Sequence, residues 1–174
     1  MWVDRLISLI RDISDFPEPG VVFKDITPVL GDGKALSVLV DALAEPHKGS
    51  GITKVAGIEA RGFTLATPVA DRLGAGFIPV RKPGKLPHET MREDYALEYG
   101  TDALEVHIDS VIQGEKVLVV DDVIATGGTA AAAVRLLRAV GADVVGIAVF
   151  IELAFLGGAE KLDGVPLHAL VRYD

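Results

Sequence analysis

Cysteine is absent from this chain of 174 residues, which excludes disulfide bonds and catalysis by a thiol. Apolar residues come only in short blocks such as residues 117–120, far below the ~18 consecutive apolar residues that a membrane-spanning helix needs. The first residues carry Asp4 and Arg5 within a helical pattern and lack a small-residue cleavage site, so no signal peptide is visible. These absences favour a cytoplasmic protein with no membrane partner.

Positive charge is also scarce, because 17 lysines and arginines face 25 aspartates and glutamates, for a formal net charge of −8. This balance argues against non-specific binding of nucleic acid, which depends on a basic surface. The histidines are scattered and lack the spacing of metal ligands, so we expect no dedicated metal site. They stand at positions 47, 88, 107 and 168.

Hydrophobic residues are abundant, at 49% of the chain with a mean hydropathy of +0.37, which excludes disorder. The length suits one domain covering residues 1–174. Strands are predicted at residues 21–25, 54–58, 76–81, 97–99, 104–108, 116–121, 143–151 and 165–173, the last at an edge. Helices are predicted at residues 2–13, 34–44, 63–73 and 128–140.

Strands that alternate with helices predict an α/β fold with a mainly parallel, twisted sheet flanked by helices. Crossovers between parallel strands are right-handed, so the carboxyl ends of the strands share one edge, where ligands collect. Residues 82–97 form a long polar stretch with weak periodicity, which is typical of a lid or a disordered loop.

A phosphate-binding loop is predicted where the strand at residues 116–121 meets the helix from residue 128. Glycines let the backbone wrap an anion closely, and the first N–H groups of the helix point at it with the favourable end of the dipole. Thr126 and Thr129 add hydroxyl donors. The loop residues are Ala125, Thr126, Gly127, Gly128 and Thr129.

Two carboxylates, Asp121 and Asp122, stand just before this loop and would repel a phosphate, so they need another partner. A vicinal diol supplies two O–H donors that ionised carboxylates accept strongly. A diol and a phosphate this close together match the two ends of one ribose 5-phosphate. The alternative is that the acidic residues only stabilise the dipole at a helix N-terminus. That would explain the presence of one aspartate, but not two aspartates followed by a glycine-containing loop.

A second strand-to-helix junction lies at residues 58–62, on the same expected sheet edge. Its N–H groups and the Arg61 side chain can hold a second anionic group. The alternative is an arginine on the surface at a tight turn.

Residues 117–130 resemble the 5-phosphoribosyl diphosphate signature of the type I phosphoribosyltransferases, with the sequence VLVVDDVIATGGTA. Four further stretches resemble the members of that family that use adenine. They are FPEPGVVFKDITPVL at residues 16–30, GIEARGF at 57–63, RKPGKLP at 81–87 and YALEYG at 95–100. Together they sample nearly the whole chain in the family's order.

The resemblance implies transfer of a phosphoribosyl group from phosphoribosyl diphosphate to adenine, giving AMP and pyrophosphate, in purine salvage. It assigns the pyrophosphate to Ala60, Arg61 and Gly62, with Lys82 and Lys85 approaching from a flexible lid over residues 82–98. It also implies a small N-terminal hood over residues 1–33 and a homodimer.

The resemblance makes Glu98 the catalytic glutamate, which takes or stabilises the proton of the attacking base, with Tyr99 beside it near the closed lid. It assigns the adenine to Val22, Phe23 and Lys24. An aromatic ring such as Phe23 can stack on a purine, and extended backbone at Val22 can offer its N–H and C=O. Lys24 stands where many members carry arginine, so its contact is open.

Phosphoribosyl diphosphate carries several negative charges, so we expect Mg²⁺ as a cofactor, held mainly by substrate oxygens and water. Two alternatives to adenine transfer stay open. One is another base, such as hypoxanthine or guanine. The other is a regulator that senses phosphoribosyl diphosphate and binds nucleic acid or a protein, which the acidic net charge and the absence of spare length disfavour.

Overall fold

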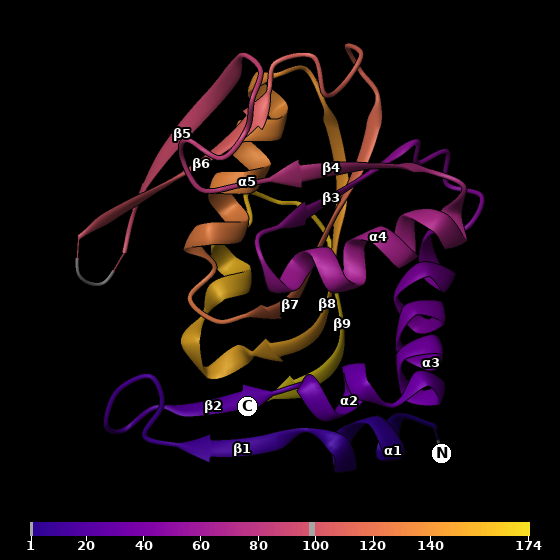
Figure 1. Ribbon diagram of the computed structural model, residues 1–174, viewed down its shortest axis with the longest axis vertical. Coiled ribbons are helices and arrows are strands. Elements are labelled where there is room, and N and C mark those ends of the chain that lie inside the picture. Colours follow the sequence, from indigo (N-terminus) through magenta and orange to yellow (C-terminus); the bar gives the residue numbers. More distant parts are fainter. Residues whose placement is uncertain (1, 98–99) are drawn as a thin grey trace.

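The computed structural model describes residues 2–97 and 100–174, and a five-stranded parallel sheet lies at its centre (Figure 1). The strand order is β4-β3-β7-β8-β9, and every neighbouring pair is parallel. The strands are β3 (Lys54–Ile58), β4 (Gly76–Val80), β7 (Lys116–Ile124), β8 (Asp143–Leu153) and β9 (Leu167–Tyr173). The predicted parallel sheet and its C-terminal edge strand are therefore confirmed.

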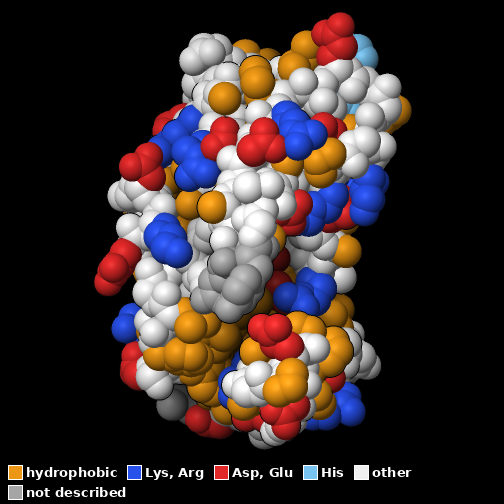
Figure 2. Space-filling view, turned by 90° about the vertical axis from the view of Figure 1, so that its left-hand side faces the viewer, with side chains coloured by type: hydrophobic (Ala, Val, Ile, Leu, Met, Phe, Trp, Pro, Cys, Tyr) orange, Lys and Arg blue, Asp and Glu red, His pale blue; other side chains and the backbone are white. Residues whose placement is uncertain are grey.

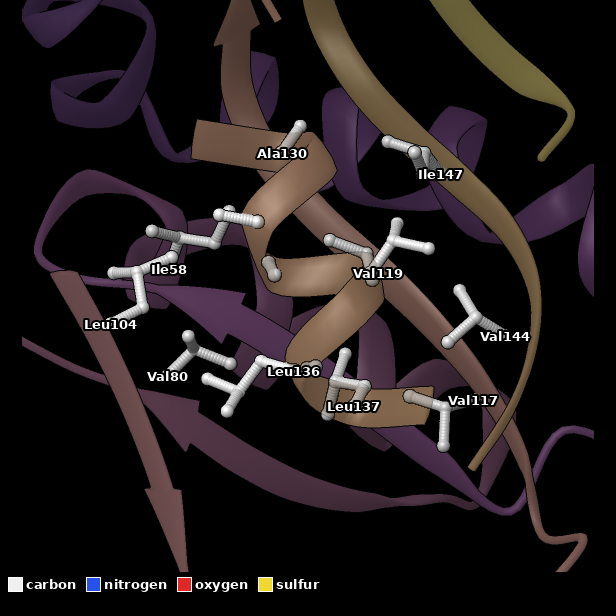
Figure 3. Close-up of a cluster of buried hydrophobic side chains, with 14 of the residues drawn as sticks. Ile58, Val80, Leu104, Val117, Val119, Ala130, Leu136, Leu137, Val144 and Ile147 are labelled. Atoms are coloured by element: carbon white, nitrogen blue, oxygen red, sulfur yellow. The ribbon is translucent and has the colours of Figure 1, made fainter. Parts of the chain in front are cut away.

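Helices cover both faces of the sheet. Successive side chains of a central strand therefore enter two different cores, one on each face. Val117 and Val119 of β7 point into the core beneath α5 (Gly128–Ala139), as Figure 3 shows. Leu118 and Val120 point into the opposite core, beneath α3 (Gly33–Ala44) and α4 (Arg61–Leu73). A strand buried on both faces reads as an uninterrupted apolar run, as residues 117–120 do.

The N-terminal hood consists of α1 (Trp2–Leu9), β1 (Arg11–Ser14), β2 (Val22–Asp25) and α2 (Thr27–Gly31). The helix predicted over residues 2–13 is wrong beyond Leu9, because Ile13 lies in β1 and pairs with Phe23 of β2. Pairing with a distant strand overrides a weak local helical pattern. The short helix α2, which has proline in its first turn, was not predicted from the sequence.

The region after β4 is more ordered than the sequence predicts. An antiparallel hairpin joins β5 (Thr90–Ala96) to β6 (Thr101–His107). The strand expected at residues 97–99 is wrong at Leu97, which lies outside both strands, and residues 98 and 99 lie outside the described residues. β5 buries only Tyr95, so it lacks the alternation by which a strand is recognised.

Short 3₁₀ helices complete the chain. They are η1 (Glu45–His47), η2 (Ala154–Leu156) and η3 (Gly158–Lys161). Among the described residues, no helix is long and apolar enough to cross a bilayer.

Candidate functional site

A cavity of about 420 Å³ lies at the carboxyl ends of β3 and β7. These strands are neighbours in the sheet, with Gly57 opposite Val120, so the segments that follow them face one another. The cavity is lined by residues 58–61, by Lys82 and by residues 121–130.

Most of the described residues that the sequence singles out for anions and ribose line this one cavity. They are Ala60, Arg61, Lys82, Asp121, Asp122, Ala125, Thr126, Gly127, Gly128 and Thr129. Gly62, Lys85 and the three proposed base-binding residues, Val22, Phe23 and Lys24, do not line it. Glu98 and Tyr99 lie outside the described residues.

The predicted phosphate loop is a tight turn that packs against the start of η3. Gly127 has a φ of +79°, and a Cβ there would lie 2.2 Å from the carbonyl oxygen of Gly158. A Cβ at Gly158 would lie 2.3 Å from the carbonyl oxygen of Ala125. Glycine is therefore required on both sides of this contact, and Gly127 leaves the first N–H groups of α5 without a capping side chain.

The carboxylate pair lies within β7, which runs three residues beyond the predicted strand end, to Ile124. Burial raises the pKa of Asp121 well above its usual range, and the neighbouring charge of Asp122 raises it further. The backbone N–H of Asp122 donates to Asp121 Oδ1 at 2.9 Å. A Cβ at Gly62 would lie 2.9 Å from that same oxygen, so Gly62 lets α4 begin directly against the pair.

Arg61 connects the carboxylate pair to the hood. Its Nε lies 2.6 Å from Oδ2 of Asp122, which is only 4% exposed. Its guanidinium carbon lies 5.0 Å from the ring centroid of Phe23, and Phe16 packs edge-on against the same ring. The segment expected to read the base thus meets the cavity through one arginine.

The hood presents apolar side chains to solvent near this site. Val22 is 48% exposed and Phe16 is 50% exposed. Figure 2 shows hydrophobic side chains gathered toward the lower end of this face, where Figure 1 draws the hood. Lys24 is held elsewhere: its ammonium donates to Asp12 at 2.8 Å and lies 4.1 Å from the ring centroid of Tyr173.

Glu59 is a site residue that the sequence reasoning missed. Its nearly buried carboxylate accepts hydrogen bonds from Lys85 Nζ at 2.5 Å, the Lys82 N–H at 2.8 Å and Arg81 Nε at 3.1 Å. Burial alone would raise its pKa, but these three donors together lower it. The sequence offered one signal for this residue: a glutamate that stands between a predicted buried strand and Arg61.

Lys82 reaches the cavity wall from the segment after β4. Its ammonium donates to the Asp102 carboxylate and, at 3.2 Å, to the Tyr95 hydroxyl. Burial lowers the pKa of Lys82, but the hydrogen bonds to Asp102 and Tyr95 outweigh it and raise the pKa overall. Tyr95 and Asp102 were not predicted, because they lie far from the cavity-lining segments in the sequence.

The site therefore combines a glycine-containing loop, a carboxylate pair and a strand-to-helix junction that carries an arginine. Residues 30–163 match the phosphoribosyl transferase domain, which defines the class of protein. The adenine phosphoribosyltransferase of Thermobifida fusca is 62% identical over 97% of this chain and 94% of its own. That of Streptomyces coelicolor is 58% identical over 97% of this chain and 94% of its own.

Solved structures agree with the sequence relatives. The adenine phosphoribosyltransferase of Rhodothermus marinus superimposes with a TM-score of 0.94 at 52% identity, covering 99% of this chain and 98% of its own. The enzyme of Thermoanaerobacter pseudethanolicus gives 0.96 at 48% identity, covering 98% and 99%. This chain belongs to the adenine phosphoribosyltransferase family.

Proposed function

We propose that this chain transfers the 5-phosphoribosyl group of phosphoribosyl diphosphate to adenine, giving AMP and pyrophosphate in purine salvage. The observation that carries the proposal is the single cavity that unites the loop at residues 125–129, the Asp121–Asp122 pair and the junction at Arg61. Family membership supports the choice of adenine. The solved enzyme of Saccharomyces cerevisiae, 36% identical, is described as a complex with adenine.

The phosphoribosyl end occupies the wall formed by β7 and α5. Residues 125–129 wrap the 5′-phosphate with backbone N–H groups and the hydroxyls of Thr126 and Thr129. Asp121 and Asp122 accept hydrogen bonds from the two ribose hydroxyls. An ionised pair accepts both bonds best, and the two O–H donors then offset part of the repulsion between the carboxylates.

The pyrophosphate end occupies the opposite wall, at Ala60, Arg61 and Gly62, with Lys82 and Lys85 approaching it. The arginine and both lysines are paired with carboxylates in this structure. Pyrophosphate would replace a carboxylate at one or more of these cations. The same cations stabilise the charge that develops on the leaving group as its bond to the ribose breaks.

The base meets the hood. We assign its stacking to Phe23 and its edge to the extended backbone at Val22, since Phe23 already lies over Arg61 beside the carboxylate pair. Lys24 belongs to the same segment, and its bonds to Asp12 favour a role in holding β2 in place. Glu98 takes the proton of the attacking base at the end of the lid over residues 82–98, and Tyr99 follows it near the closed lid. Both roles come from the resemblance alone.

Mg²⁺ fits this site as a substrate-held ion. Within the described part of the chain, no three acidic, histidine or cysteine side chains gather as a metal cage. The cavity offers two carboxylates, Asp121 and Asp122, and Mg²⁺ commonly binds through one or two carboxylates, water and substrate phosphates. When bound it neutralises charge on the diphosphate.

The domain organisation, the assembly and the location that we propose follow those implied by the family. We propose one catalytic domain over residues 1–174, with its hood at residues 1–33, acting as a homodimer. The cysteine-free sequence supports a cytoplasmic location, and the net charge of −8 supports small molecules rather than nucleic acid as ligands.

The test is to incubate the protein with Mg²⁺, phosphoribosyl diphosphate and adenine, hypoxanthine or guanine in turn, and to separate the nucleotides. AMP and pyrophosphate in equal amounts support the proposal. A nucleotide from another base alone would move the protein to another base specificity. Binding of phosphoribosyl diphosphate without turnover of any base would contradict an enzyme and favour the regulator.

A further inference from the structure

The hydroxyl of Tyr95 joins three separate parts of the site. It accepts a hydrogen bond from Lys82 Nζ at 3.2 Å and one from Thr129 Oγ1 at 3.3 Å, and it donates to Asp102 Oδ2 at 3.3 Å. A phenol has one donor and two acceptor positions, so all of its hydrogen-bonding capacity is used. Lys82 and Thr129 both line the cavity.

The two cavity residues serve opposite ends of the proposed substrate. Thr129 belongs to the loop for the 5′-phosphate, whereas Lys82 belongs to the pyrophosphate side. Lys82 uses two of its three N–H donors on Tyr95 and Asp102, which leaves one for a ligand oxygen. A lysine loses much rotamer freedom when it is fixed, so a side chain held in advance binds an anion at a lower entropic cost.

The hairpin supplies the rigid support for this junction. Tyr95 and Asp102 are opposite each other in the β5–β6 register, and Tyr95 is 6% exposed while most of β5 is solvent-facing. The ring belongs to the hydrophobic core beneath α5, and its Cδ2 lies 3.9 Å from the Cβ position at Gly128. The phenol is therefore anchored by packing, and its oxygen is hydrogen-bonded to the side chains of Lys82 and Thr129.

We propose that Tyr95 is a positioning residue for phosphoribosyl diphosphate. Its hydroxyl holds Lys82 for the pyrophosphate and ties it to Thr129 in the 5′-phosphate loop. The inference rests on the proposed function, because it takes the ends of the substrate from there. Tyr95 touches no reacting atom and acts through Lys82 and Thr129.

The test is Tyr95→Phe, which removes the hydroxyl and keeps the ring in the core. We expect the dissociation constant of pyrophosphate, measured by calorimetry with Mg²⁺, to rise about two- to tenfold, the usual worth of one hydrogen bond. The KM for phosphoribosyl diphosphate should rise likewise, and the KM for adenine should stay unchanged. Tyr173→Phe is the matched control, because the Tyr173 ring contacts Lys24 and the residue does not line the cavity.

A double-mutant cycle separates positioning from general stability. In a Lys82→Met background, the effect of Tyr95→Phe on pyrophosphate binding should disappear, because the side chain that the phenol positions is gone. Equal losses in both backgrounds, or an unchanged dissociation constant in Tyr95→Phe, would overturn the inference. A parent protein that makes no AMP would instead refute the proposed function, so the two failures are distinguishable.

Discussion

At the scale of single residues, the cationic side chains of the site form ion pairs with carboxylates of the same chain. Each predicted pyrophosphate cation is paired with an acidic side chain of its own chain. The pairs are Arg61 with Asp122, Lys82 with Asp102 and Lys85 with Glu59. A charge in a partly buried site is costly unless it is paired. The carboxylates thus hold the three cations in place, and in the proposed complex phosphate oxygens would replace them.

The ionisation of Asp121 opposes folding. Because its pKa is raised in the folded state, the folded chain binds more protons than the unfolded chain above the ordinary pKa of an aspartate. Stability therefore falls as the pH rises through that window. We expect Asp121→Asn to be more stable than the parent at neutral pH, and the gain to shrink as the pH falls toward the ordinary carboxyl pKa. Thermal unfolding at several pH values measures this.

The same substitution should weaken AMP binding about ten- to a hundredfold, the worth of a hydrogen bond to a charged group. The gain in stability and the loss of binding share one cause, the carboxylate held beside Asp122 for the sugar. Asp71→Asn is the control, since its side chain is 80% exposed on α4. Calorimetric AMP affinity equal to the parent's would remove Asp121 from the ribose site.

Glu98 carries a prediction that depends on sequence alone. It ends a polar stretch outside the two anion-binding turns, so it should meet the base only when the lid closes. Glu98→Gln keeps the size and polarity but cannot take a proton, and we expect turnover to fall about 10²–10⁴-fold. The affinities for AMP and phosphoribosyl diphosphate should change little.

Steady-state kinetics with separate binding measurements decide the matter. Glu89→Gln, an exposed glutamate just before β5, should behave as the parent does. Turnover of Glu98→Gln within a factor of about two of the parent is far below the acid–base range and would exclude Glu98 from the mechanism.

At the scale of elements, one backbone contact fixes the loop at residues 125–129, which we propose binds phosphate. Gly158 begins η3, and its carbonyl oxygen and Cα press against Gly127. We expect Gly158→Ala to push the loop away from η3, because its Cβ would lie 2.3 Å from a backbone oxygen that cannot rotate aside. Overpacking of this kind costs about 1–3 kcal/mol of stability.

The displaced loop should also bind AMP and inorganic phosphate more weakly. Gly33→Ala should leave the AMP affinity unchanged and should not lower stability, since no atom lies within 4 Å of its Cβ position. Calorimetry and thermal unfolding on both variants measure this. Parent-like stability together with parent-like AMP affinity in Gly158→Ala would show that the contact yields without consequence.

The elements that could be predicted are those whose burial leaves a periodic pattern. The apolar run at residues 117–120 predicts β7, and the helical spacing of apolar residues predicts α3. β5 is held by pairing with β6 while most of its side chains face solvent, so its sequence carries no such pattern. The hydrogen-bond partners of Lys82, Tyr95 and Asp102, could not be predicted for a related reason, because their position depends on the register of that hairpin.

At the scale of the whole molecule, the proposed recognition is divided between two parts of the fold. The edge of the parallel sheet gathers the groups that we propose for phosphate, ribose and pyrophosphate, whereas the hood brings β2 toward the same cavity through Arg61 and Phe23. The meeting of residues 58–61 and 121–130 at one sheet edge could be predicted from the sequence, because Arg61 marks the first segment, and glycines and carboxylates mark the second. The hood's approach could not, since it depends on the packing of β1 and β2 around a turn.

The base selectivity is the prediction that belongs to this scale. If extended backbone of β2 at Val22 reads the edge of the base, its carbonyl is placed to receive a proton from the 6-amino group of adenine. Hypoxanthine has an oxygen at that position, so the two acceptors would face each other and stay unpaired. Sites built on such hydrogen bonds reject the wrong partner strongly, and we expect kcat/KM for adenine to exceed that for hypoxanthine by at least about a hundredfold.

The comparison requires both bases at equal concentration with saturating phosphoribosyl diphosphate and Mg²⁺. Because the proposed anion-binding edge is common to both reactions, the KM for phosphoribosyl diphosphate should be similar with either base. The two reactions should differ only in the kcat/KM for the base. Val22→Ala keeps the backbone groups and should preserve the preference. A preference for hypoxanthine or guanine would contradict base reading by this segment and leave the assignment of the sheet edge intact.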